Sequence, residues 1–222
     1  PEVLKSQDVV RFDTSAYDFR SEVAALLEHA GPRVGFGSFE GESRELEDFS
    51  AKDSVFSSFR YEKHWRQCVL EAESFLRVYE RLVRDVVCPA LRRKLGPEAP
   101  STTFFYQFPP TLRLQPGPSG QFRRVHRDAE YGHQDGEVNF WMPLTDYART
   151  QVTLWVESAP DAGDYGALGL DYGAIGMFHG TNCRHWVPAN ETPFTRVSMD
   201  FRIGVGRCFD PGWALDGIGH VH

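Results

Sequence analysis

Two histidines and an aspartate in the second half of the chain could bind a metal ion. The stretch "RRVHRDAEYGHQDGEVNFWMPLT" (123–145) contains His126 and Asp128, separated by one residue. Side chains two residues apart in a β-strand lie on the same face, so the imidazole and the carboxylate are expected to point the same way. Buried ionisable groups are costly unless they are paired or bound to a metal. The spacing therefore suggests a metal site, with a surface hydrogen bond between the two side chains as the alternative.

A strand near the C-terminus suggests an anion site. In "TPFTRVSMDFRI" (192–203), apolar residues alternate with polar ones, as expected of a half-buried strand. The polar face would point Arg196 and Ser198 into the interior, where a guanidinium needs an anionic partner. We expect residues 183–187 and 194–203 to pair as an antiparallel hairpin that places His185 opposite Arg196. The second histidine would then complete the metal site beside the anion site.

Two other histidines compete with His185 as a metal ligand. His179 lies shortly before it, and a one-residue slip in register would reverse the facing of every side chain. We favour His185 because it follows the turn "GTN" and lies opposite Arg196 in the expected hairpin. His133 follows the first pair in a loop, where a substrate contact is the preferred interpretation. A structural histidine is the alternative for both His133 and His179.

Short segments rich in aromatic and β-branched residues predict a β-rich core. They are separated by Pro, Gly and Asn, and lie near 103–108, 111–115, 122–128, 136–143, 151–157, 166–170, 174–179, 183–187 and 194–203. Eight or nine short strands without helices between them indicate an antiparallel sandwich or barrel.

The first hundred residues carry two helical patterns. "YDFRSEVAALLEHAGP" (17–32) stops at Gly31-Pro32, and a second apolar stripe runs from about Tyr61 to Leu95, where Pro89 is expected to break or kink the helix. Residues 33–58 are predicted to form a long loop, and the tail after 203 is irregular. The helices are expected to pack outside the β-core.

The motif residues resemble those of the Fe(II)- and 2-oxoglutarate-dependent dioxygenases. "HRD" at 126–128, the downstream His185 and "RVS" at 196–198 match the HxD…H…RxS pattern of that superfamily. The resemblance covers residues 101–203, about half of the chain. It implies a mostly β fold, the double-stranded β-helix or cupin-like jelly roll, with flanking N-terminal helices. We expect a single oxygenase domain over 1–222, with a helical part (1–100), the β-helix core (101–203) and a tail (204–222).

The resemblance also implies a role for each motif residue. His126, Asp128 and His185 would hold Fe(II) and leave positions open, as in two-histidine, one-carboxylate oxygenase sites. The co-substrate 2-oxoglutarate would chelate the metal, and Arg196 and Ser198 would bind its far carboxylate. The expected activity is oxidation of an unactivated C–H bond of a small molecule by O2, with release of succinate and CO2. Hydroxylation, desaturation, cyclisation and epimerisation all remain open.

Strand parity adds weaker candidates. Gln115 and Asn139 are expected to contact the co-substrate or its chelate. The candidate substrate contacts are Arg113, which could instead contact the co-substrate, His133, Glu137 and Trp141.

Acidic loops near the expected mouth favour a cationic or polyhydroxylated substrate. The carboxylates concerned are Glu130, Asp135, Glu137, Glu157, Asp161 and Asp164, with Arg113 and Arg127 as the few balancing cations. The stretches "GEVNFWMPLT" and "TRVSMDFR" are also similar to small bacterial oxygenases of natural-product pathways, including those acting on aminocyclitol or aminoglycoside antibiotics.

Composition excludes several other classes of function. The net charge is −7 without a basic run, so no nucleic-acid partner is expected. No apolar stretch reaches the length of a membrane span and no signal-peptide pattern begins the sequence, so we expect a cytoplasmic protein. The four cysteines are scattered, which favours reduced thiols over a zinc ribbon or a disulfide framework.

Two functions from other classes remain as alternatives. A cupin-like sugar-binding protein or isomerase would share the barrel without redox chemistry. A zinc hydrolase could use the same two histidines and aspartate. Neither alternative supplies an anionic partner for the interior Arg196. A purely structural sandwich would not supply one either.

Overall fold

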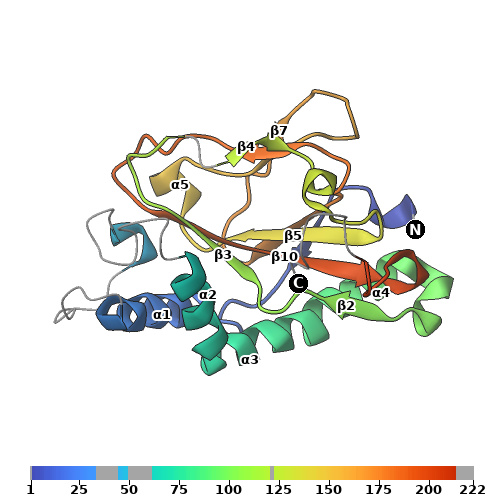
Figure 1. Cartoon of the computed structure of the whole chain (residues 1–222), viewed down its shortest axis with the longest axis horizontal. Coiled ribbons are helices and arrows are strands. Elements are labelled where there is room, and N and C mark those ends of the chain that lie inside the picture. The colour runs from blue at the N-terminus through green and yellow to red at the C-terminus, as the bar shows by residue number, and fades with distance from the viewer. Residues whose placement is uncertain (1, 34–44, 50–61, 121–122, 214–222) are drawn as a thin grey trace.

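The chain forms two facing antiparallel sheets, with helices against the outer face of the larger one (Figure 1). This computed structural model describes residues 2–33, 45–49, 62–120 and 123–213. The major sheet has the order β1-β8-β5-β10-β2, and β3 also pairs with β10. The minor sheet has the order β4-β9-β6-β7. The predicted double-stranded β-helix with outer helices is therefore confirmed.

The strands fall where the sequence predicts them, with one addition. They are β1 (Asp8–Arg11), β2 (Phe104–Tyr106), β3 (Thr111–Gln115), β4 (Arg123–His126), β5 (Glu137–Pro143), β6 (Trp155–Val156), β7 (Gly166–Ala167), β8 (Ala174–Phe178), β9 (His185–Val187) and β10 (Arg196–Val205). The addition is β1, a short and mostly exposed edge strand that lacks the apolar alternation of a half-buried strand. One expectation was wrong, because the short helix α5 (Tyr147–Thr150) lies between β5 and β6.

The predicted second helix is divided into three. The helices are α1 (Phe19–Arg33), α2 (Glu62–Glu71), α3 (Glu73–Leu82) and α4 (Cys88–Leu95), with a π-helical turn at Val83–Val87. The π-helical turn ends two residues before Pro89, and the backbone N–H of Cys88 bonds to Val83 O. Proline lacks the N–H that a continuous α-helix would use, so the expected irregularity occurs just ahead of it.

Short helical turns complete the described chain. They are Glu2–Leu4, Leu46–Asp48, Gly96–Ser101, Asp128–Tyr131 and Gly206–Cys208. Most of the predicted 33–58 loop, and residues 214–222 of the predicted tail, lie outside the described residues.

The two faces of the major sheet differ sharply in chemistry. The outer face joins the helices in one apolar core through Val138, Phe140, Met142, Val197, Met199, Phe201 and Ile203. The inner face carries Asn139 and Trp141 on β5, and Arg196, Ser198 and Arg202 on β10. The helices therefore fix the sheet from outside while its inner face is free to carry a polar site.

The expected hairpin between 183–187 and 194–203 was wrong. Strand β9 pairs with β4 and β6 in the minor sheet, whereas β10 pairs with β2, β3 and β5 in the major sheet. His185 therefore lies opposite His126, and Arg196 lies opposite Gln115. The segment between the two strands crosses from one sheet to the other. Buried Asn190 fixes it, donating from Nδ2 to Gln115 O at 3.0 Å and to Phe194 O at 2.7 Å.

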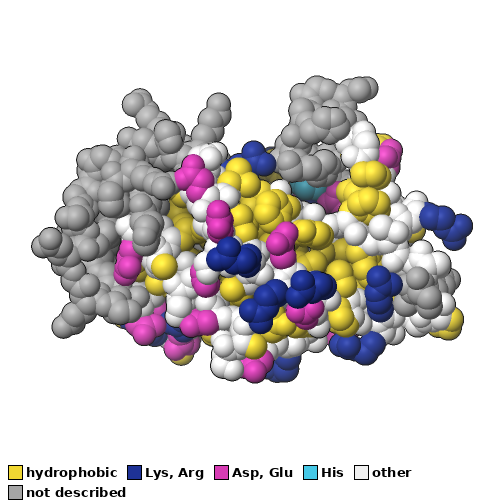
Figure 2. Space-filling model, turned by 90° about the horizontal axis from the view of Figure 1, so that it is seen from below, with side chains coloured by type: hydrophobic (Ala, Val, Ile, Leu, Met, Phe, Trp, Pro, Cys, Tyr) yellow, Lys and Arg dark blue, Asp and Glu magenta, His cyan; other side chains and the backbone are white. Residues whose placement is uncertain are grey.

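Within the described residues, no helix has both the length and the apolar character needed to cross a membrane. On the face of the molecule that Figure 2 shows, basic and acidic side chains are interspersed among apolar ones.

Replacing Phe201 with Ala is predicted to lower the free energy of unfolding by about 3–5 kcal/mol. Its ring stacks on Phe140 with centroids 5.2 Å apart and meets Tyr79 edge-on at 5.3 Å, joining sheet to helix. Urea unfolding followed by circular dichroism measures the loss. Val9→Ala, at a position 46% exposed, is the control and should change stability by less than about 0.5 kcal/mol. Equal effects of the two changes would contradict this view of the core.

Candidate metal and co-substrate site

His126, Asp128 and His185 form a compact group that could hold a metal ion. One ligand atom from each residue lies within 4.8 Å of the other two. Asp128 Oδ1 is 3.7 Å from Nε2 of His126 and 3.5 Å from Nε2 of His185. The Nδ1 atoms of the two histidines lie 2.8 Å from Arg124 O and 3.1 Å from Cys183 O. Those backbone contacts orient both rings so that Nε2 faces the carboxylate.

Neighbouring strands of the minor sheet bring the three residues together. His126 ends β4 and lies directly opposite His185 on β9. Asp128 does not lie in a strand as expected, because β4 ends at His126 and a 3₁₀ turn begins at Asp128. Arg127 between them is still extended, with φ −106° and ψ 146°, so the two side chains keep to the same side. The two side chains therefore face the same way, as predicted, although the strand ends at His126.

The second carboxylate oxygen of Asp128 is bound by protein donors. Oδ2 accepts hydrogen bonds from Asn139 Nδ2 at 2.6 Å and from Arg202 Nε and Nη2 at 3.0 and 2.8 Å. Burial raises the pKa of Asp128, but the charge of Arg202 and the hydrogen bond with His185 outweigh it and hold the pKa well below its usual range. The buried carboxylate is therefore ionised, as a metal ligand must be.

A second polar group lies on the inner face of the major sheet, around Arg196. Arg196 is 2% exposed and Ser198 is fully buried. Arg196 Nε and Nη1, Ser198 Oγ and Trp141 Nε1 are buried without a hydrogen-bond partner among the described residues. The Arg196 guanidinium lies 5.7 Å from the centre of the Trp141 ring. Two residues on β10 and one on neighbouring β5 thus present unpaired donors in one region.

The unpaired donors require an explanation because each is expensive. A buried donor without a partner costs about 1–3 kcal/mol, and more when it is charged. Burial lowers the pKa of Arg196 to about 9, an effect that nearby Arg113 adds to and Asp200 opposes. A bound carboxylate would supply the missing acceptors and stabilise the guanidinium. The donor set therefore fits an anion that bears a carboxylate.

The weaker candidates lie in two places. Gln115 is opposite Arg196, but its Nε2 already donates to Pro188 O at 2.9 Å. Asn139 contacts Asp128 instead of the region around Arg196, and Trp141 packs against Arg196 itself. Arg113 forms a two-pronged ion pair with Asp200, at 2.7 and 3.2 Å.

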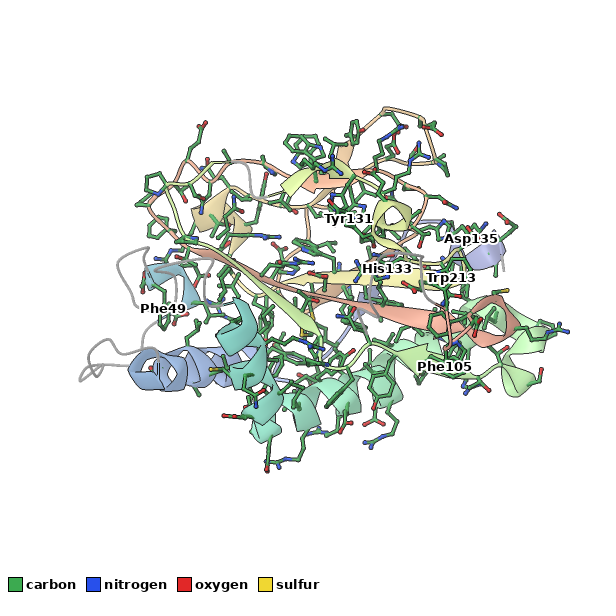
Figure 3. All side chains as sticks on the ribbon, in the orientation of Figure 1. Phe49, Phe105, Tyr131, His133, Asp135 and Trp213 are labelled. Atoms are coloured by element: carbon green, nitrogen blue, oxygen red, sulfur yellow. The ribbon has the colours of Figure 1, made fainter. Side chains whose placement is uncertain are left out.

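His133 and Glu137 form a pair beside the metal group. His133 Nδ1 lies 2.7 Å from Glu137 Oε2, and the backbone N–H of His133 donates to Asp128 O at 3.3 Å. Figure 3 shows His133 with Tyr131 and Trp213 on one side of the molecule, and Trp213 Nε1 donates to Gly132 O at 3.0 Å. His179 points elsewhere, with Nε2 3.1 Å from Asp135 O.

The expectation that few cations balance the acidic loops was wrong. Glu157 is fully buried, where it accepts from the backbone N–H of Arg184 at 2.6 Å and that of Gly163 at 3.1 Å. The remaining carboxylates have partners: Asp161 pairs with Arg127 and Arg184, Glu130 with Arg124, Asp135 with Lys5, Glu137 with His133, and Asp164 with Ser158. Of the cations that were not counted, Lys5 and Arg184 are distant in sequence from the carboxylates they bind, whereas Arg124 lies only six residues from Glu130 and was overlooked.

Arg202 and Gly180 also shape the site and were not predicted from the sequence. Arg202 follows the same parity as Arg196 and Ser198 on β10, so the alternation contained the signal. Gly180 lies where a side chain would approach within 2.6 Å of Asn139. That constraint depends on the packing of β5 against the β8–β9 turn and leaves no local pattern.

Comparison with known proteins supports the fold. No model of a known protein family matches this chain. The streptomycin biosynthesis protein StrG of Streptomyces griseus is 35% identical over 131 residues, which are 57% of this chain and 61% of StrG. The match thus spans about three fifths of that relative's length.

Two solved structures are similar at low identity. The non-heme alpha-ketoglutarate-dependent epimerase SnoN from nogalamycin biosynthesis superposes with a TM-score of 0.51 and 16% identity, over 96% of this chain and 88% of SnoN. A prolyl-4-hydroxylase from Pseudomonas putida has a TM-score of 0.48 and 14% identity, over 90% and 88%. The likeness to SnoN shows that the two chains share a fold.

Replacing His185 with Ala is predicted to weaken binding of Co(II) by more than about 100-fold. That is the largest loss expected from mutating a residue that only supports a metal ligand. His179→Ala, a nearby buried histidine outside the group, is the matched control and should bind Co(II) as the unchanged protein does. Isothermal titration without oxygen measures both. The reverse pattern would make His179 the ligand.

Replacing Arg196 with Met is predicted to leave the protein at least as stable when no ligand is added, because the change removes a buried charge without a partner. Arg20→Met is the contrast, since Arg20 binds the buried carboxylate of Glu47 at 2.8 Å. That change should cost about 3 kcal/mol. Thermal unfolding compares the two. An equal loss of stability would mean that Arg196 has a structural partner.

Proposed function

We propose that the protein is a non-haem Fe(II)- and 2-oxoglutarate-dependent oxygenase that oxidises a C–H bond of a small polar molecule and releases succinate and CO2. The observation that carries the proposal is the pairing of a two-histidine, one-carboxylate group on the minor sheet with a separate set of unpaired buried donors on the inner face of the major sheet. A metal alone would explain the first feature. A co-substrate with a free carboxylate explains both.

His126, Asp128 and His185 would hold the ferrous ion through Nε2, Oδ1 and Nε2. Two imidazoles and one carboxylate suit Fe(II) and leave positions for exogenous ligands. When bound, the iron would supply the activation of O2 that the protein side chains cannot perform. The chain orients both imidazoles and keeps Asp128 ionised.

Arg196 and Ser198 would bind the far carboxylate of 2-oxoglutarate. The guanidinium and the hydroxyl lie on one face of β10 and lack partners. Trp141 Nε1 is an additional donor in the same region, so we assign Trp141 to the co-substrate side of the site instead of the substrate side. Gln115 would support Arg196 from β3. The zinc-hydrolase and cupin alternatives offer no comparable explanation for these unpaired donors.

The substrate would meet a polar wall on the β3 side of the barrel. The half-buried inner-face residues there are Gln107, Thr111, Arg113, Asp200 and Arg202. Amide, hydroxyl, guanidinium and carboxylate groups together suit a substrate rich in hydroxyl or amino groups. His133 and Glu137 would flank the metal on the other side. The matched relative is named for streptomycin biosynthesis, which supports a natural-product substrate.

The proposed unit of function is the whole chain as one oxygenase domain. In support, one apolar core contains helical residues such as Leu27 and Tyr79 together with strand residues such as Phe140 and Val197. The helical part would therefore be needed to hold the site.

Adding Fe(II) and 2-oxoglutarate without oxygen is predicted to give the weak visible charge-transfer band of the chelated co-substrate. Admitting O2 should then convert 2-oxoglutarate to succinate, even slowly without substrate. In Arg196→Met, half-saturation of the band should need at least about tenfold more 2-oxoglutarate, because a charge-assisted pair is lost. Arg20→Met is the control, and it should keep the affinity of the unchanged protein. A protein that binds Fe(II) but gives no band with 2-oxoglutarate would contradict the proposal.

A further inference from the structure

Asp128 is held by a closed ring of hydrogen bonds that joins three separate segments. The backbone N–H of Asp128 donates to Gly180 O at 2.9 Å, and the N–H of Gly180 donates to Asn139 Oδ1 at 3.1 Å. Asn139 Nδ2 then donates to Asp128 Oδ2 at 2.6 Å. The ring connects the turn after β4, strand β5 and the turn that leads to His185. It therefore couples the carboxylate to the segment that carries the second histidine.

Arg202 also donates hydrogen bonds to Oδ2 of Asp128. Its Nε and Nη2 both bond to Oδ2, while Nη1 lies 3.3 Å from Gln107 Oε1. Gln107 is itself fixed, since its backbone N–H donates to Arg202 O at 2.9 Å and its Nε2 to Thr111 Oγ1 at 2.9 Å. The guanidinium is thus anchored at both ends. With the bond from Asn139, three donors occupy Oδ2.

The two carboxylate oxygens of Asp128 have different partners, which limits how Asp128 can bind a metal. A carboxylate can accept through both oxygens, and many metal sites use both. Here Oδ2 is saturated, and Oδ1 alone faces the imidazoles of His126 and His185. A metal would therefore receive one oxygen from Asp128.

We propose that Arg202 and Asn139 are positioning residues that keep Asp128 a one-oxygen ligand and so hold a coordination position open. The inference rests on the proposed function, since the open position is what a chelating co-substrate and O2 require. Neither residue touches the metal. Gly180 supports the same arrangement, because a methyl group at this position would lie 2.6–2.8 Å from the Asn139 side chain and displace it.

The test is anaerobic titration with Co(II), whose visible spectrum reports coordination number and whose affinity is measured by calorimetry. Arg202→Gln, Asn139→Ala and Gly180→Ala should each weaken Co(II) binding by about 10–100-fold. They should also shift the spectrum away from that of the unchanged protein. Arg202→Lys keeps a cationic donor and should restore part of both. A purely structural loss would lower stability without changing the spectrum of the bound ion.

Arg20→Gln is the matched control, since it removes a guanidinium from the buried Glu47 carboxylate away from the metal group. It should lower the melting temperature and leave the Co(II) affinity and spectrum unchanged. If Arg202→Gln does not fold, Asn139→Ala and Arg202→Lys carry the test. Unchanged affinity and spectrum in the folded variants would overturn the inference. Absence of Co(II) binding by the unchanged protein would instead overturn the proposed function.

Discussion

The buried carboxylate of Asp128 is the interaction on which the site depends. An ionised carboxylate at 2% exposure is unfavourable unless its charge is compensated. Arg202 and Asn139 compensate one oxygen from the major sheet, and the other oxygen faces two histidines of the minor sheet. The two sheets must therefore face each other at this depth for the carboxylate to remain ionised. The jelly roll provides that arrangement, and the outer helices hold the major sheet in place.

The same strand carries a charge that is left uncompensated. Along the inner face of β10, Arg202 and Asp200 have ion-pair partners, whereas Nε and Nη1 of Arg196 have no hydrogen-bond partner among the described residues. Stability and the proposed function conflict at Arg196, because its unpaired guanidinium nitrogens weaken the folded state unless an anion binds. The alternation of β10 thus builds, on one face, both the support of the metal group and the proposed anion pocket.

Much of the architecture could be predicted from the sequence, because the strands of 101–203 carry strong alternation and the helices a strong apolar stripe. The metal group could be predicted because a local feature, the facing of His126 and Asp128, met a recognisable downstream motif. The pairing of β9 could not be predicted, because a hairpin between neighbouring strands is the simpler arrangement. The residues that stabilise the crossing between sheets, such as Asn190, act over long range in the sequence. The ion pair between Lys5 and Asp135 could not be predicted for the same reason, since the two residues are far apart in the sequence. Arg202 shares the alternation of Arg196 and Ser198, so its facing could be predicted, but no sequence motif distinguished it from other residues of the strand.

The central claim is that one ferrous ion and one 2-oxoglutarate share the inner face of this barrel. The most direct measurement is a crystal structure grown without oxygen in the presence of both, with anomalous scattering recorded at the iron edge. The account predicts a single iron peak bonded to Nε2 of His126, Oδ1 of Asp128 and Nε2 of His185, with the far carboxylate of the co-substrate on Arg196. An iron peak elsewhere, or a co-substrate carboxylate that does not meet Arg196, would contradict it.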